Sequence, residues 1–551
     1  MYVRVKTSPN SKGRSVQIVT SARKGSHVIQ KIVRHVGMAY DDYELEKLKL
    51  LAESIKIKLE ADCQQLLVSP EELAKIKIAA EDVYSKDDYN VNLKDLTEEA
   101  RVVSGIHDIY GTLFDELSYG RVISNPKRNV SAASIFKDIV LARIANPASK
   151  RASVDKLEED FGISIDLDSV YRMMDKLDKK AIDKLQAITY TNTATLFSGK
   201  ISVIFFDATT IYFESFSQDS LKNNGFSKDK KFGQPQVLFA LLVTEDGLPI
   251  GYRLFEGNKY EGHTLIPVLS EIGKKYDIGK VIFVADSAMM AHYNTSFLDT
   301  NGFSYIVGAR LKSLPKELKD KILDGANYTA VEEGASIASF EYNKKRLVVS
   351  YSAKRAAKDS YDRESAILSI QKRLSKTKNP KDYLSSYGYK KYIKLQNNTT
   401  LDIDQDRVEA DSVWDGLLGV ITNDKESTPG QILGHYHNLY HVEDAFRVTK
   451  HDLAVRPVFH WKPTRIAAHI AICFCAYALV KHLEYRVRLQ YIKMSPEKIR
   501  QSLIRIQTSI LFDKKRKIRY GLPSKMSIDA RKIYDIFRIK KNLTPYIIKK
   551  L

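Results

Sequence analysis

Cysteine is scarce in this chain of 551 residues, which contains only Cys63, Cys473 and Cys475. Three cysteines cannot form the disulfide framework of a small secreted protein, and the sequence has no Cys-x-x-Cys pair of the kind that binds zinc. The cysteine content therefore favours a protein of a reducing cytoplasm.

Long apolar runs are also missing. Residues 1–6 lack the apolar core of a signal peptide. The most apolar stretch, residues 466–480, includes His469 and is shorter than the roughly 20 residues that a membrane-spanning helix needs. We expect a buried helix there and no membrane partner.

Acidic residues are outnumbered by basic ones, 67 to 87, which gives a formal net charge of +20. Such an excess predicts a polyanionic partner. Because no membrane segment is expected, nucleic acid is the better candidate. The hydrophobic content of 44% and the charged content of 28% indicate a soluble globular protein, and the length allows several domains.

The order of strand and helix patterns predicts how the chain is organised. A strand meander, a helix and then strands alternating with helices are typical of an α/β, ribonuclease-H-like catalytic core. A long segment between core elements indicates an inserted subdomain. The predicted regions are a small α+β N-terminal module (1–95), a helical region that is a candidate for DNA binding (96–197), the core in two parts (198–309 and 411–455), a strand-rich insertion between them (310–410) and a basic helical C-terminal region (456–551).

A candidate helix-turn-helix lies in the helical region. Residues 153–161 and 167–177 have helical patterns that Gly162 separates, and the second helix carries Arg172. A basic second helix suits DNA recognition. A helical hairpin within a bundle has the same pattern, so the sequence leaves both interpretations open.

Residues 428–450 are predicted to form one helix, because a capping box and a proline stand at its start. Tyr436, Glu443 and Lys450 are spaced seven apart, which places them on one stripe of such a helix. Phe446 beside the stripe turns it towards the protein, where a carboxylate needs a cation or a proton. An amphipathic helix with an exposed Glu–Lys pair explains the same spacing.

Asp207 and Asp286 each follow an apolar strand. One such acid is often only a turn residue, but together with Glu443 they predict a carboxylate cluster. Three clustered carboxylates raise one another's pKa unless a divalent cation neutralises them, and oxygen ligands favour Mg²⁺ or Mn²⁺. Two such ions can activate a water or a 3′-hydroxyl for attack on a phosphodiester. Asp207, Asp286 and Glu443 are therefore the predicted metal-binding and catalytic residues.

Blocks of sequence around these acids resemble the DDE transposases of bacterial insertion sequences. Among these transposases, the blocks are similar to those of the insertion sequence 4 superfamily, whose signature is Y-x2-R-x3-E-x6-K. The blocks, in chain order, are residues 206–214, 225–229 and 284–289, the Tyr436, Glu443 and Lys450 pattern, and residues 453–460.

The resemblance implies a Mg²⁺-dependent transposase. Such an enzyme binds the terminal inverted repeats of its element, cleaves the DNA ends and joins the 3′-hydroxyls to target DNA. The resemblance implies that Asp207, Asp286 and Glu443 hold two metal ions, and that a homodimer forms on DNA in the bacterial cytoplasm, at the nucleoid. A catalytically silent DNA-binding descendant and a metal-dependent nuclease without strand transfer are the alternatives.

The resemblance also implies DNA contacts. Tyr436 and Lys450 would contact phosphates near the transposon end. Leu439 occupies the arginine position of the signature, so Arg447 and Arg456 are the candidates for the arginine contact.

Two further features have competing interpretations. His437 and His441 have the four-residue spacing of a zinc pair, but the HExxH pattern is missing, and we expect them to face DNA or solvent. Asp415 is an additional acidic candidate, whose alternative role is that of a turn residue at a strand end.

Overall fold

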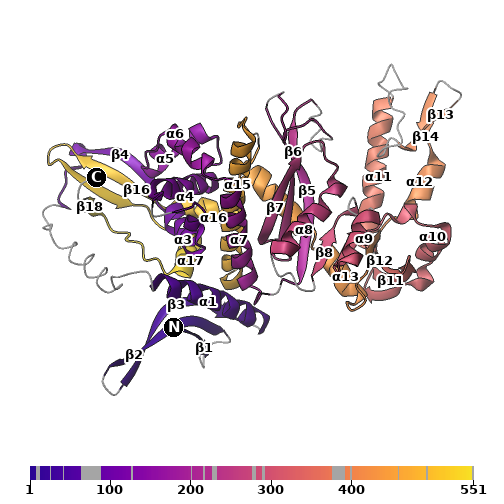
Figure 1. Ribbon diagram of the computed structural model, residues 1–551, viewed down its shortest axis with the longest axis horizontal. Coiled ribbons are helices and arrows are strands. Elements are labelled where there is room, and N and C mark those ends of the chain that lie inside the picture. Colours follow the sequence, from indigo (N-terminus) through magenta and orange to yellow (C-terminus); the bar gives the residue numbers. More distant parts are fainter. Residues whose placement is uncertain are drawn as a thin grey trace.

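The computed structural model describes residues 1–7, 13–24, 27–40, 42–63, 89–125, 128–199, 201–214, 217–225, 233–275, 281–287, 292–374, 391–396, 400–456, 458–491 and 494–548. It is a mixed α/β structure in which helices surround a large sheet (Figure 1). Part of the second sequence block, residues 226–229, and residues 288–289 of the third lie outside the described residues.

The central sheet has nine strands in the order β10-β11-β12-β15-β9-β8-β5-β6-β7. Strands β5, β6 and β7 form an antiparallel meander, and β8 and β9 run parallel to β5. The remaining strands continue the sheet beyond β9 in antiparallel fashion. The strand bounds are β5 (Val203–Tyr212), β6 (Gln236–Thr244), β7 (Pro249–Glu256), β8 (Ile282–Ala285), β9 (Ser304–Gly308), β10 (Thr329–Glu332), β11 (Ala335–Tyr342), β12 (Lys345–Ser352) and β15 (Leu417–Thr422).

The two faces of β5 pack against different helices, because successive side chains of a strand point to opposite faces. Ile204, Phe206 and Ala208 share a core with α8 (Leu265–Lys275) and α9 (His292–Thr300). Val203, Phe205 and Ile211 share the other core with α14 (Tyr440–Arg447) and α15 (Pro463–Gln490). Asp207 comes two residues after Phe205, so its side chain points to the same face as Phe205, the face that α14 covers.

Helix α15 runs through the centre of the helical half of the molecule (Figure 1). By length and composition it could cross a membrane, but 94% of its most apolar window is buried inside the protein. The prediction of a buried helix for residues 466–480 is confirmed. Helices that pack on α15 include α4 (Val130–Ala145), α6 (Leu167–Asp175), α7 (Lys179–Thr195), α16 (Pro496–Ile504) and α17 (Ile528–Phe537).

The predicted helix pair forms in the region before the sheet. Helix α5 (Lys150–Phe161) ends at Gly162, whose φ of +68° is left-handed, and α6 begins after its N-cap Asp166. Glycine adopts that φ without strain, which explains the break. A short helix α3 (Thr112–Glu116) precedes α4.

The C-terminal region differs from the helical prediction. It contains β16 (Gln507–Asp513), β17 (Ile518–Pro523) and β18 (Tyr546–Ile548) besides its helices. Strand β16 pairs with β4 (Leu96–Val103), from the other end of the chain. The backbone hydrogen bonds of β16 thus depend on β4, which is about 400 residues away in the sequence. No local sequence pattern predicts this pairing. The basic run at residues 514–517 is the turn between β16 and β17.

The N-terminal residues form the expected α+β unit, with β1 (Tyr2–Thr7), β2 (Arg14–Lys24), β3 (His27–Ala39) and α1 (Asp42–Cys63). Two ion-pair clusters join it to the rest. Glu116 accepts hydrogen bonds from Arg34 of β3 and, at 2.7 Å, from Arg486 of α15. Asp246, in the β6–β7 turn, pairs with Lys47 at 3.0 Å and Arg488 at 2.6 Å.

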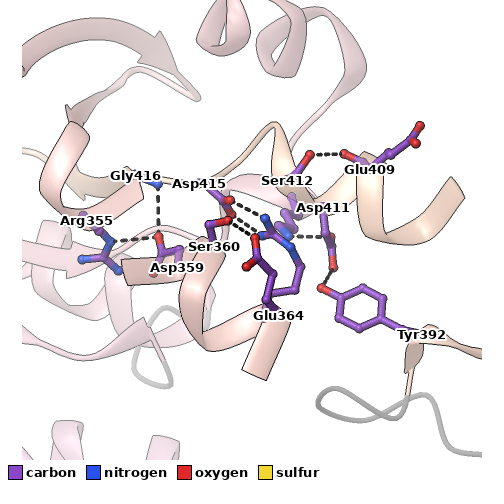
Figure 2. A network of polar contacts seen from close by, with 12 residues as sticks. Arg355, Asp359, Ser360, Glu364, Tyr392, Glu409, Asp411, Ser412, Asp415 and Gly416 are labelled. Carbon is purple, nitrogen blue, oxygen red and sulfur yellow. Dashed lines mark hydrogen bonds and ion pairs between the residues drawn. The ribbon is translucent and has the colours of Figure 1, made fainter. Parts of the chain in front are cut away.

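The insertion is tied to the sheet by a network of polar contacts (Figure 2). Asp415 accepts two hydrogen bonds of 2.6 Å from Arg363 of α11 (Ala353–Leu374). Asp411 accepts hydrogen bonds from Lys312 at 2.5 Å and from the Tyr392 hydroxyl at 2.7 Å. Asp415 therefore holds α11 against the start of β15, a structural role. The other elements here are α10 (Lys316–Leu323), β13 (Ile393–Gln396), β14 (Thr400–Ile403) and α12 (Gln405–Ser412).

Candidate active site

Three parallel strands bring Asp207 and Asp286 to neighbouring positions. Phe206 of β5 is in register with Ala285 of β8, which is in register with Val307 of β9. The next residues are Asp207 in the middle of β5, Asp286 directly after β8, and Gly308, the last residue of β9. The prediction that an apolar strand ends at Asp207 is therefore wrong, because β5 continues to Tyr212 in its pairing with β6, whereas Asp286 does follow its strand. Neighbouring strands lie about 4.8 Å apart, so the two aspartates stand side by side. Asp207 is half-buried and Asp286 is exposed.

The glutamate helix is interrupted, which corrects the prediction of one continuous helix. Helix α13 (Pro429–His437) starts with the expected capping box but ends before Leu439, and α14 begins at Tyr440. Hydrogen bonds between residues three apart join them, including Leu439 N–H to the Tyr436 carbonyl at 3.1 Å. A π-helical turn, Val448–Asp452, follows α14. The turn near Leu439 is tighter than an α-helix and the π-helical turn is wider, so both change the rotation per residue. The seven-residue spacing of Tyr436, Glu443 and Lys450 therefore does not by itself place them on one side of a helix.

The Tyr436 hydroxyl nevertheless lies near two of the predicted acids. Burial, together with the negative charges of Asp286 and Glu443 and against the opposing charge of Arg355, raises the pKa of Tyr436 to about 12. The side chain passes over the end of β9, because a Cβ added at Gly308 would lie 2.4 Å from the Tyr436 hydroxyl oxygen. Tyr436 thus links the end of β9 to Asp286 and Glu443.

Glu443 lies on the exposed side of α14. The opposite side of that helix docks on the sheet, with the Phe446 ring 6.0 Å from that of Phe239 and the His441 ring 6.5 Å from that of Phe205. Across the described ranges, no group of three His, Cys, Asp or Glu side chains is placed to hold a metal ion. The fold therefore gathers the three acids around one corner of the sheet without closing them into a metal site.

Lys450 reaches the face of β5 that carries Asp207. Its Nζ donates a 2.5 Å hydrogen bond to the hydroxyl of Thr209, which stands two residues after Asp207 and so on the same side of the strand. Lys450 is half-buried. This contact places the ammonium group beside the aspartate strand rather than on an open helix surface.

The three arginines predicted to contact DNA lie in different places. Arg447 is exposed and hydrogen-bonds to Asp444 at 2.8 Å and Asp452 at 3.4 Å. The Arg456 guanidinium lies 5.4 Å from the ring centre of Tyr212, the last residue of β5. Arg172 is 70% exposed on α6 and donates a hydrogen bond of 2.6 Å to Ser169.

Sequence reasoning missed Gly308 and Arg355. Gly308 ends the apolar strand β9, and an apolar run before it in the sequence is the signal that could have identified it. Arg355 lies in the first turn of α11, inside the insertion, and acts on the Tyr436 hydroxyl through its charge. No motif marks it.

His441 does not face DNA or solvent as predicted. It is half-buried against Phe205. Burial, together with the positive charges of Lys481 and Arg488, lowers its pKa to about 4. His441 therefore stays neutral near pH 7, whereas His437 is exposed.

Comparison with known proteins identifies one family. A family model described as a transposase DDE domain matches residues 198–479, just over half of the 551 residues. No curated protein matches the sequence. Among solved structures, the Mos1 transposase paired-end complex with left transposon end is 14% identical over 29% of this chain, with a TM-score of 0.15. The similarity spans 54% of that chain, and so low a score carries no argument.

Proposed function

This chain belongs to the transposase DDE domain family, and from that premise we propose that it is a transposase of the insertion sequence 4 superfamily. In this proposal it binds the terminal inverted repeats of an insertion sequence, cleaves the DNA ends and joins the 3′-hydroxyls to target DNA. The adjacent positions of Asp207 and Asp286 on parallel strands, with Tyr436 close to both Asp286 and Glu443, are the observation that carries it.

We propose that the ribonuclease-H-like core consists of β5 to β9 with α14. The order β7-β6-β5-β8-β9, with the first three strands antiparallel and the last two parallel to β5, supports this. The two aspartates are neighbours in that order, because the parallel register pairs Phe206 of β5 with Ala285 of β8, one residue before each aspartate. The glutamate comes from a helix packed on the same face.

Asp207, Asp286 and Glu443 are the residues that would hold two Mg²⁺ or Mn²⁺ ions, because they offer only oxygen ligands. Such ions supply charge stabilisation for in-line attack on a phosphodiester. The proposal requires Glu443 to approach the two aspartates when DNA binds. The tight turn before α14 and the π-helical turn after it are where the chain can adjust, since π-helical turns often occur at functional sites.

Five side chains are proposed to contact DNA. The Tyr436 hydroxyl is protonated near pH 7, as tyrosine ordinarily is, so it can donate a hydrogen bond to a phosphate. Lys450, on the face of Asp207, adds a positive charge there. Two transposon ends must be held at once, so we propose a homodimer on double-stranded DNA. The remaining three proposed contacts are Arg447, Arg456 and Arg172.

A catalytically silent DNA-binding descendant is the second candidate. It is favoured by one observation, that the described residues form no three-donor metal group. DNA cleavage by the purified full chain separates the two candidates. A silent descendant binds transposon ends with no Mg²⁺-dependent product.

The test uses a plasmid that carries the element's own ends, with Mg²⁺. We expect Asp207→Ala, Asp286→Ala and Glu443→Ala each to abolish cleavage while retaining end binding. Glu409→Ala, which removes an exposed carboxylate from α12, is the matched control and should cleave normally. Cleavage at the wild-type rate by any of the three variants would remove that residue from the proposed site.

A further inference from the structure

A basic cavity lies outside the carboxylate corner, between α5, α6 and the segment that follows α14. Its volume is about 470 Å³. The cationic residues that line it are Arg143, Lys150, Arg151 and Arg456, and none of its lining residues is acidic. A cavity with this lining attracts an anion.

Two of its cations are buried without an acidic partner among the described residues. Arg143 is 2% exposed and Lys150 is 4% exposed. Arg143 Nη1 donates only to the carbonyls of Leu453, at 3.4 Å, and Ala454, at 3.2 Å, and its buried Nε has no hydrogen-bond partner. Burying a charge is costly unless an opposite charge compensates it. The positive charges of Arg143 and Lys150 are therefore not compensated by an acidic side chain among the described residues, and a bound anion would compensate them.

Lys150 is held by a histidine rather than by a carboxylate. Its Nζ lies 3.2 Å from His469 Nδ1, and His469 Nε2 lies 3.0 Å from the Val455 carbonyl. Because Nε2 must donate to that carbonyl, Nδ1 is the acceptor. Burial, with the charge of Arg143, lowers the pKa of Lys150 to about 7. Burial and the neighbouring positive charge therefore both disfavour the ammonium form of Lys150, and a bound anion would favour it.

The N-terminus of α5 opens onto the same cavity. The helix starts at Lys150 after the N-cap Ser149, which also lines the cavity. A helix N-terminus carries a partial positive charge and free backbone N–H groups, which suit a phosphate. Arg143, Lys150 and this helix end therefore converge on one space.

The cavity is connected to the catalytic strand. Arg456, which lines it, lies over the ring of Tyr212 at the end of β5. Five residues separate Tyr212 from Asp207, which is about 17 Å along a strand. The exposed Phe459 ring and Tyr171 add aromatic walls, against which a sugar or base can pack.

We propose that this cavity, which we call the Arg143–Lys150 pocket, binds a phosphate group through Arg143, Lys150 and the first turn of α5. The phosphate can be part of a DNA strand that also enters the carboxylate corner, and in that form the inference rests on the proposed function. Free phosphate offers the same chemistry, and the two arms of the test distinguish these sources.

The first arm measures thermal unfolding of the full chain in phosphate and in chloride of equal ionic strength. We expect phosphate to raise the wild-type Tm saturably, because it binds only the folded pocket. Lys150→Gln and Arg143→Gln should lose this response while unfolding no earlier than wild type in chloride, since each removes an uncompensated buried charge. Lys156→Gln, an exposed lysine on the same helix, is the matched control and should keep the response.

The second arm measures binding of end DNA as a function of salt. If a DNA phosphate fills the pocket, Lys150→Gln should weaken binding about tenfold and reduce the salt slope by about 1, and inorganic phosphate should compete. If Lys150→Gln changes only the phosphate response, free phosphate is the ligand. The proposal would be overturned if Lys150→Gln and Arg143→Gln both kept the wild-type Tm response to phosphate and the wild-type DNA binding. It would also be overturned if both variants unfolded at a lower temperature than wild type in chloride but kept the phosphate response.

The variants of the carboxylate corner separate this inference from the proposed function. Glu443→Ala should abolish cleavage and leave the phosphate response of the Tm unchanged. Loss of cleavage with an unchanged Tm response to phosphate would show that phosphate binding in the pocket does not depend on the catalytic residues.

Discussion

At the scale of single residues, the candidate site depends on the close approach between Tyr436 and Gly308. We predict that Gly308→Ala lowers the cleavage rate about tenfold, because the added Cβ displaces the Tyr436 hydroxyl, which is 2.4 Å from its position. Tyr436→Phe removes that oxygen. The double variant should therefore cleave no more slowly than Tyr436→Phe alone, since coupled sites are not additive. Additive losses would contradict the steric explanation.

His441 gives a prediction about pH. Its folded pKa of about 4 is below the ordinary value near 6.5, so the unfolded chain binds the extra proton. The contribution of His441 to stability is therefore complete above pH 6.5 and is lost as the pH falls towards 4. The wild-type unfolding free energy should fall between pH 7 and pH 4.5. In His441→Asn this fall should be smaller by on the order of 1 kcal/mol, after allowance for solvent screening. Urea titrations check this, with the exposed His437→Asn as control, and equal pH dependence of wild type and His441→Asn would contradict it.

Residue positions could be predicted only where a local pattern carried them. Asp207 and Asp286 each come after an apolar run in the sequence, and the register of β5 and β8 places them together, although β5 continues past Asp207 to Tyr212. Their catalytic role stays a prediction. The position of Arg355 depends on how α11 docks, which is a tertiary arrangement without a local signal. The orientation of His441 depends on packing against Phe205, which also has none.

At the scale of secondary-structure elements, α11 is the element that brings the insertion to the site. Asp415 fixes it through two hydrogen bonds to Arg363, while Arg355 in its first turn pairs with Asp359 at 3.7 Å and is close enough for its charge to lower the pKa of Tyr436. We predict that Asp415→Asn lowers the unfolding free energy by about 1–3 kcal/mol, because it weakens a charge-assisted pair. Arg355→Ala should leave stability within about 0.5 kcal/mol and lower the cleavage rate. Urea unfolding and plasmid cleavage check both, and the reverse pattern would contradict these roles.

The glutamate helix shows why element boundaries were harder to predict than element types. The capping box at Thr428 specified the start of α13, and the structure contains it. The tight turn near Leu439 and the π-helical turn after Arg447 follow from packing on the sheet, which helix periodicity does not encode. The spacing of seven assumed one continuous helix, which does not form, although Tyr436 lies near Glu443 and Lys450 contacts Thr209 on the Asp207 face of β5.

At the scale of the whole molecule, buried ion pairs join the N-terminal unit to the helices. Glu116 is paired with Arg34 and Arg486. Burial alone would raise the pKa of Glu116, but the two guanidinium groups lower it. We predict that Glu116→Gln lowers the unfolding free energy by about 3–5 kcal/mol, because it leaves buried arginines without a charged partner. Glu98→Gln, in a surface pair with Arg101, should leave the unfolding free energy close to that of the wild type, because water screens an exposed pair. Equal costs in urea unfolding would contradict this role of Glu116.

The arrangement of distant segments was the part of the fold that sequence patterns could not supply. Strand β4 pairs with β16 across most of the chain, and β10 to β12 extend the central sheet beyond β15 and β9. Both depend on edge hydrogen bonds between segments remote in sequence. The helical core around α15 was predictable, because an apolar run of that length has to be buried.

The central claim, that three carboxylates jointly hold divalent cations on DNA, is tested most directly by counting bound Mn²⁺. The measurement is electron paramagnetic resonance of the full chain in complex with its end DNA. We predict two bound ions per active site in the wild type, and loss of at least one in each of Asp207→Ala, Asp286→Ala and Glu443→Ala. Wild-type Mn²⁺ binding by Glu443→Ala, with end DNA still bound, would contradict the claim.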